Sequence, residues 1–111
     1  MLTSGYQLFN TSITAAVLGN PVQVNKGFGG CIVVSSASPI DPALNQVQVV
    51  MQMGSEAGTG GGSGYVIVSS SKVLSTNSAV GPIYFPPGTY RVRTIAGSTI
   101  TNLFVGIYST L

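Results

Sequence analysis

The amino-acid sequence predicts an all-β protein: an antiparallel two-sheet β-sandwich, Greek-key or jelly-roll-like, with a small β-barrel as the alternative fold. Seven to nine short segments either alternate apolar and polar residues or run apolar throughout, as strands do. Clusters of Gly, Pro, Asn and Ser separate these segments, and none is patterned as a helix of convincing length. A chain of 111 residues with this pattern is expected to form a single β-sandwich domain, residues 1–111.

A proline corner near the carboxyl terminus carries the sharpest local signal. Pro86 and Pro87 cannot donate to a β-ladder, so a strand must end at Phe85. Gly88 supplies the permissive backbone for a turn, and a new strand begins at Thr89. The stretch therefore predicts a hairpin around the two prolines.

The strand after this corner has two different faces. Tyr90, Val92 and Thr94 share one face, whereas Arg91 and Arg93 share the other. One face is expected to pack in the core, and the other to meet water or a partner. Tyr90 directly follows the turn, which is the position of a tyrosine-corner residue.

The other predicted strands cover residues 7–18, 22–24, 28–35, 45–53, 65–69, 72–75, 82–85 and 99–108, with a loop over 76–81. A helix is the competing interpretation for 14–18, but five residues without a cap are too few to stand as one. Gly29 and Gly30 predict a bulge or a close backbone approach. The 99–108 strand is apolar on both faces, which predicts a central strand or one whose outer face meets a partner.

Residues 54–64 are rich in glycine and predict a flexible loop at the tip of a hairpin. The alternative, a phosphate-binding loop, requires a following helix and a Gly-Lys-Ser/Thr ending. A strand begins instead at Tyr65, and no lysine stands in the required place.

The scarcity of charge is the most unusual property of the composition. Only 5% of the residues are charged, against a usual share of about 25%, while 44% are hydrophobic and the mean hydropathy is +0.46. Monomers normally guard their sheet edges with charges, so we expect neighbouring copies or a larger partner to cover much of this surface. An extracellular Ser/Thr-rich domain that is merely uncharged is the alternative.

The few ionisable groups argue against several functions. A net charge of +2 without clustered cations excludes a nucleic-acid footprint; the six charged residues are Lys26, Lys72, Arg91, Arg93, Asp41 and Glu56. The sequence has no histidine and only one cysteine, which excludes a zinc site, a Ser-His-Asp or Cys-His catalytic arrangement and an intrachain disulfide. We therefore expect no enzyme activity, no metal and no cofactor.

Three of these residues have ordinary structural interpretations. Cys31, among glycines and branched aliphatic residues, is expected to be a small buried hydrophobe. Asp41 precedes Pro42 as a turn residue, and Glu56 lies in the glycine-rich segment. A glycosidase would need two facing carboxyls, about 5 to 10 Å apart, and these two stand in separate loops.

The amino terminus lacks the basic and apolar regions of a secretory signal, and no apolar run approaches the roughly 20 residues of a membrane helix. We therefore expect synthesis and retention in the cytoplasm unless the protein leaves as part of a particle.

Four residues are candidates for partner binding: Arg91, Arg93, Tyr84 and Tyr108. The two arginines form a small cationic face that could bind carboxylates of a partner, or a plain solvated strand face. The tyrosines could stack on sugar rings, although tyrosine in alternating strands more often fills a core or an interface.

The segment Tyr84–Val92, YFPPGTYRV, resembles small β-sandwich virion proteins of tailed bacteriophages, as does the low-charge Ser/Thr/Gly-rich background. This group includes capsid decoration, or cement, proteins and the sandwich modules of tail fibres. The motif covers the carboxyl-terminal third, and the rest is similar in composition only. Pro-Gly-Thr-Tyr corners also occur in fibronectin-like and carbohydrate-binding sandwiches, so the resemblance assigns no functional residue.

The resemblance implies a non-enzymatic virion structural protein that binds the outer capsid surface at subunit junctions and stabilises the shell. Its partners would be the major capsid protein and copies of itself, as a homotrimer or dimer. It would be synthesised in the host cytoplasm and located on the capsid surface. The alternative is a receptor- or glycan-binding module of a phage tail fibre or adhesin.

Overall fold

The computed structural model describes residues 5–14, 17–38, 40, 45–52, 65–68, 74, 77–96 and 99–110. They form eight strands: β1 (Gly5–Ile13), β2 (Val22–Val24), β3 (Phe28–Ser35), β4 (Asn45–Gln52), β5 (Tyr65–Ile67), β6 (Ser78–Phe85), β7 (Gly88–Ala96) and β8 (Ile100–Ser109). Among these residues, no helix is long and apolar enough to cross a membrane. The glycine-rich segment 54–64, the predicted strand at 72–75 except Leu74, and Asp41, Glu56 and Lys72 lie outside the described residues.

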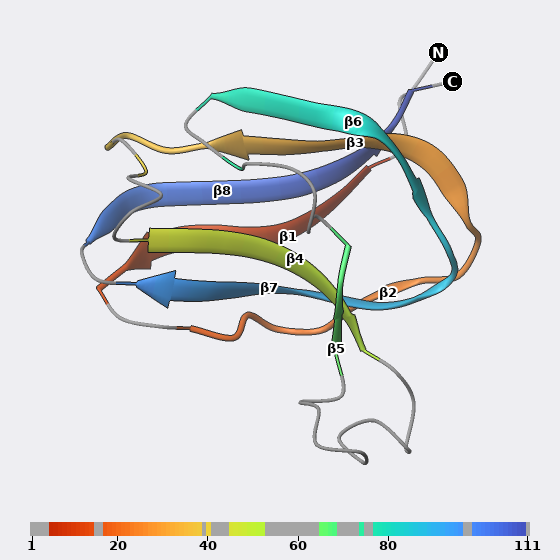
Figure 1. Cartoon of the computed structure of the whole chain (residues 1–111), viewed down its shortest axis with the longest axis horizontal. Helices are drawn as coiled ribbons and strands as arrows, with labels where there is room; N and C mark the ends of the chain where they lie inside the picture. The colour runs from red at the N-terminus through yellow and green to blue at the C-terminus, as the bar shows by residue number, and fades with distance from the viewer. Residues whose placement is uncertain are drawn as a thin grey trace.

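The strands form two antiparallel four-stranded sheets that face each other (Figure 1). One, which we call the β8 sheet, has the order β1-β8-β3-β6; the other, the β7 sheet, has the order β2-β7-β4-β5. Strand β1 pairs with β8, β2 with β7, β3 with β6 and β4 with β5, so the two halves of the chain pair in reverse order. This nested order is that of a jelly roll. The predicted two-sheet sandwich is confirmed, and the barrel alternative is wrong because the sheets remain separate.

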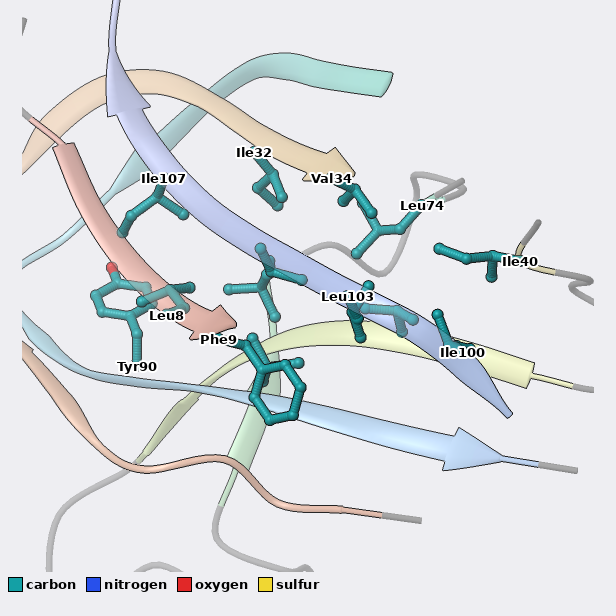
Figure 2. Close-up of a cluster of buried hydrophobic side chains, with 14 of the residues drawn as sticks. Leu8, Phe9, Ile32, Val34, Ile40, Leu74, Tyr90, Ile100, Leu103 and Ile107 are labelled. Carbon is teal, nitrogen blue, oxygen red and sulfur yellow. The ribbon is translucent and has the colours of Figure 1, made fainter. Parts of the chain in front are cut away.

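The core lies between the sheets and takes its side chains from the inward face of each strand (Figure 2). Ile32 and Val34 of β3 pack with Leu103 and Ile107 of β8, and Tyr90 faces them from β7. All five side chains are buried, because successive side chains of a strand point to opposite sides. The predicted inward set on β7 is confirmed, and β8 is a central strand between β1 and β3, as its two apolar faces predicted.

The proline corner is confirmed as a corner but not as a hairpin. Strand β6 ends at Phe85 and β7 begins at Gly88, as the two prolines predicted to within one residue. However, β6 belongs to the β8 sheet and β7 to the β7 sheet, so the corner carries the chain from one layer to the other (Figure 1). The predicted hairpin is wrong, because β6 and β7 do not pair with each other: β6 pairs with β3, and β7 pairs with β2 and β4.

Tyr90 fastens this corner, as its position predicted. Its ring is fully buried, and its hydroxyl donates a hydrogen bond to the backbone carbonyl of Pro86, four residues upstream. The ring also meets Phe85 edge-on, with the ring centroids 6.1 Å apart. Burial raises the pKa of the Tyr90 hydroxyl to about 12, and the neighbouring Tyr84 adds to the shift.

Stability should therefore fall above about pH 10, because Tyr90 ionises more readily in the unfolded chain than in the core. A raised pKa leaves the stabilisation complete below the unfolded value of about 10 and removes it as the pH approaches 12. The loss is on the order of 1 kcal/mol per pH unit within this window. Denaturant unfolding of the wild type and Tyr90→Phe between about pH 9 and pH 11 measures it, and equal slopes for the two proteins would contradict it.

Two strands differ from the sequence prediction because of their positions in the sheets. The predicted loop over 76–81 is wrong: β6 begins at Ser78 and continues through Pro82. Proline is tolerated there because β6 is an edge strand and one side of its backbone needs no ladder hydrogen bond. The predicted strand over 7–18 is too long, since β1 ends at Ile13 and Leu18 already bridges to Arg93 of the other sheet.

Candidate functional site

The four predicted partner-binding residues lie on opposite outer faces of the sandwich. Arg91 and Arg93 alternate with the buried residues of β7 and so point away from the core on the β7 sheet. Tyr84 of β6 and Tyr108 of β8 lie on the outer face of the β8 sheet. The structure places each pair on one face, the arginines on the same strand and the tyrosines on two strands separated by β3, and does not combine the pairs into one site.

Arg93 is held by two hydrogen-bonded glutamines on the neighbouring strand β4. Gln48 of β4 lies opposite Arg93 in the β4–β7 register, and the Arg93 Nε donates a 3.0 Å hydrogen bond to the Gln48 Oε1. The Gln48 Nε2 in turn donates to the Gln46 Oε1 at 3.4 Å. The two hydrogen bonds fix the plane of the guanidinium, which reduces the entropy lost when it binds a planar carboxylate.

Arg91 lies one pleat along the same face and is half-buried. It is opposite Val50 of β4, which is fully buried although it points outward and stands apart from the core cluster. A branched aliphatic side chain on the outer face therefore lies beside the Arg91 side chain, and the middle of this face is partly covered. Arg91 is therefore only partly exposed to solvent, whereas a plain solvated strand face would leave it fully exposed.

The charged residues in the described part of the chain, Lys26, Arg91 and Arg93, are all cations, and two of the three lie on this face. Two arginines on alternate residues of one strand are spaced about 7 Å apart at their Cα atoms. Such a pair can bind two neighbouring carboxylates, or one carboxylate and a backbone carbonyl. The face is therefore chemically suited to an acidic protein surface.

The outer face of the β8 sheet is neutral and rich in glycine. The ring of Tyr108 lies over Gly5 and Gly106; a Cβ on Gly106 would stand 2.7 Å from the Tyr108 Cε2. This packing explains why Tyr108 is only half exposed. One face of the ring covers the two glycines and is therefore not open to a ligand. Tyr84 is different, with 65% of its surface exposed and its hydroxyl beside Gly27.

Cys31 lies on this same face and corrects a prediction. It stands opposite Tyr108 in the β3–β8 register and is half-buried rather than buried. The inward positions of β3 are taken by Gly30, Ile32 and Val34, so Cys31 must point outward. The cluster of apolar neighbours in the sequence suggested burial because β3 has apolar residues on both faces.

A groove that the sequence did not predict opens along one side of the sandwich. It has a volume of about 540 Å³ and lies between residues 7–13 of β1 and the segment formed by residues 17–20 and 22. The second wall is tied to β7 by two hydrogen bonds, from the Gly19 amide to the Val92 carbonyl and from the Thr94 amide to the Val17 carbonyl. The predicted single strand over 7–18 hid this groove, because the chain changes sheets between its two walls.

Comparisons with protein-family models, with curated proteins and with solved structures give no match to this chain. Among the described residues, no group of three or more His, Cys, Asp or Glu side chains could hold a metal ion. Function is therefore inferred from the two outer faces, the groove and the jelly-roll order.

Proposed function

We propose that this protein is a non-enzymatic structural component of a virus particle that binds the outer capsid surface at subunit junctions and stabilises the shell. The observation that carries the proposal is the β8 sheet, whose four strands contain no charged residue. The surface of a free small domain usually carries about 25–35% charged residues. A whole layer without charge is suited to lying against other protein subunits.

The jelly-roll order adds support of a weaker kind. Viral capsid domains and lectins both use this fold, so it is compatible with a particle protein but does not by itself assign a function. In the proposal, the neutral β8 sheet supplies contact area, while Arg91 and Arg93 bind carboxylates of the major capsid protein. Copies of the same chain, as a dimer or trimer, complete the assembly.

Removing either arginine should weaken capsid binding at least tenfold, because the acidic partner groups would remain desolvated without their cation. The assay is co-sedimentation of Arg91→Ala and Arg93→Ala with empty capsids assembled from the major capsid protein encoded in the same genome. Lys26→Ala is the matched control, since it removes the same charge from an exposed position between β2 and β3. The proposal fails if the wild type does not bind capsids, and the arginine assignment fails if all three variants bind equally.

A receptor- or glycan-binding module of a tail fibre or adhesin is the second candidate. The observation in its favour is Tyr84, an aromatic ring with 65% of its surface exposed on a neutral face where a sugar could stack. Tyr108 contributes less, because its ring already covers Gly5 and Gly106. Glycan-array binding that is lost in Tyr84→Ala and retained in Arg93→Ala would favour this candidate over the capsid role.

A further inference from the structure

The edge of the β8 sheet formed by β1 is long and chemically unguarded. Strand β1 spans Gly5–Ile13, nine residues without a charge or a proline, and it pairs on one side only, with β8. An edge strand presents unpaired amides and carbonyls, and proteins usually protect such edges with lysine, proline or short length. Strand β1 has none of these protections.

The other three sheet edges are each protected. Strand β6 carries Pro82 in its middle, which removes a backbone donor. Strand β5 is only three residues long, and the edge formed by β2 and residues 17–19, which also bond to β7, is interrupted by Pro21. The contrast singles out β1 as the edge available for pairing.

The groove leaves room beside this edge. It borders residues 7–13, which are most of β1, and has a volume of about 540 Å³. Among residues 5–13 and 17–22, no backbone hydrogen bond crosses from β1 to the opposite wall. An extended strand with open donors and acceptors matches the backbone chemistry of β1 better than a compact ligand does.

We propose that β1 pairs with β1 of a second copy of this chain, antiparallel across a two-fold axis, and so joins two β8 sheets into one continuous layer. In a two-fold interface a surface meets itself, so any charge on β1 would meet its own sign near the axis. The neutrality of β1 removes that repulsion, whereas pairing through the arginine face would bring four guanidinium groups together.

Two irregularities in the β1–β8 ladder limit the strength of this pairing. The register shifts between Gln7 and Phe9, where β1 has the extra residue, and between Thr11 and Ile13, where β8 has it. Phe9–Thr11 is the regular stretch between the two shifts. Bulges twist an edge and shorten the ladder that it can offer. The dimer should therefore be concentration-dependent rather than permanent.

The inference rests on the self-association included in the proposed function, but its test uses the free protein alone. Sedimentation of the wild type should show a monomer–dimer equilibrium, and Thr11→Lys should raise the dimer dissociation constant at least tenfold. Thr11 is exposed and lines the groove, so a lysine there adds a charge at the edge without entering the core. Ala79→Lys, which adds the same charge at an exposed residue of β6, should dimerise as the wild type does.

Hydrogen exchange supplies a second readout that needs no variant. Amides within residues 9–11 should exchange more slowly at high protein concentration, while those of 78–85 should be unchanged. A wild type that remains monomeric at millimolar concentration overturns the inference, as does a dimer disrupted by Ala79→Lys but not by Thr11→Lys. If the protein is a monomer but binds capsids, β1 pairing is refuted and the capsid role is kept. If the protein dimerises through β1 but does not bind capsids, the capsid role is refuted and β1 pairing is kept.

Discussion

Gly30→Ala should lower the free energy of unfolding by about 3 kcal/mol or more, whereas the same change at Gly29 should be neutral or slightly stabilising. A Cβ on Gly30 would overlap the backbone carbonyl of Tyr108, standing 2.8 Å from its carbon and 3.2 Å from the Cα of Ser109. These are backbone atoms of the adjacent central strand, so no side-chain rotation can relieve the clash. The β3–β8 ladder would have to move apart.

Gly29 is the matched control, because it is the adjacent residue of the same strand but points to the opposite side. A Cβ there meets no atom within 4 Å. Alanine also reduces the freedom of the unfolded chain, which is worth up to about 1 kcal/mol when the native backbone accepts it. Denaturant unfolding of both variants gives the comparison; similar midpoints would show that β3 and β8 do not approach as closely as described.

This pair of glycines also shows what the sequence could and could not reveal. Two adjacent glycines in a strand predicted a bulge or a close backbone approach, and the contact of Gly30 with the Tyr108 backbone confirms the close approach. The β3–β6 register also shifts between Gly30 and Ile32, but the extra residue at that point belongs to β6. The sequence could not say which glycine is the constrained one. That depends on which face of β3 meets β8, and β8 lies some 70 residues further along the chain.

Local patterning predicted most strands, because alternation is set by burial on one face. It failed where the sheet position mattered more than the residue type. The pattern predicts a strand that starts at Pro82, whereas an edge strand tolerates this proline in its middle. It also predicts a hairpin after Phe85, whereas the jelly roll carries the chain to the other sheet at that corner. Such features depend on pairing between distant segments.

The candidate site, too, was predictable from the sequence only where a feature depends on a single strand. Two arginines on alternate residues could be placed on one face of one strand, but nothing in the sequence placed Tyr84 and Tyr108 on the opposite sheet. The alignment of Gln48 with Arg93 requires the β4–β7 register, and the groove beside β1 requires knowing that the strand ends at Ile13. Each of these contacts joins segments that only the fold brings together.

Tyr90→Ala should cost about 3–5 kcal/mol of stability, and Tyr90→Phe only about 1–2 kcal/mol. The alanine variant empties the largest fully buried side-chain position and removes the edge-on contact with Phe85. Phe85 in turn packs on Phe28, with the ring centroids 5.1 Å apart, and Phe28 stacks on Tyr6 at 5.8 Å. The loss therefore reaches an aromatic row that runs from β7 across the corner into β6, β3 and β1.

The phenylalanine variant separates the ring from the hydroxyl. It keeps the aromatic packing but leaves the Pro86 carbonyl without the hydrogen bond that ties the corner to β7. Because that bond spans only four residues, its loss should speed unfolding of the corner more than it disturbs the sheets. Hydrogen exchange of the amides of residues 88–90 against those of residues 103–107 tests this, because Pro86 and Pro87 have no amide hydrogen. A uniform loss of protection in both segments would show that Tyr90 supports the whole core rather than the corner.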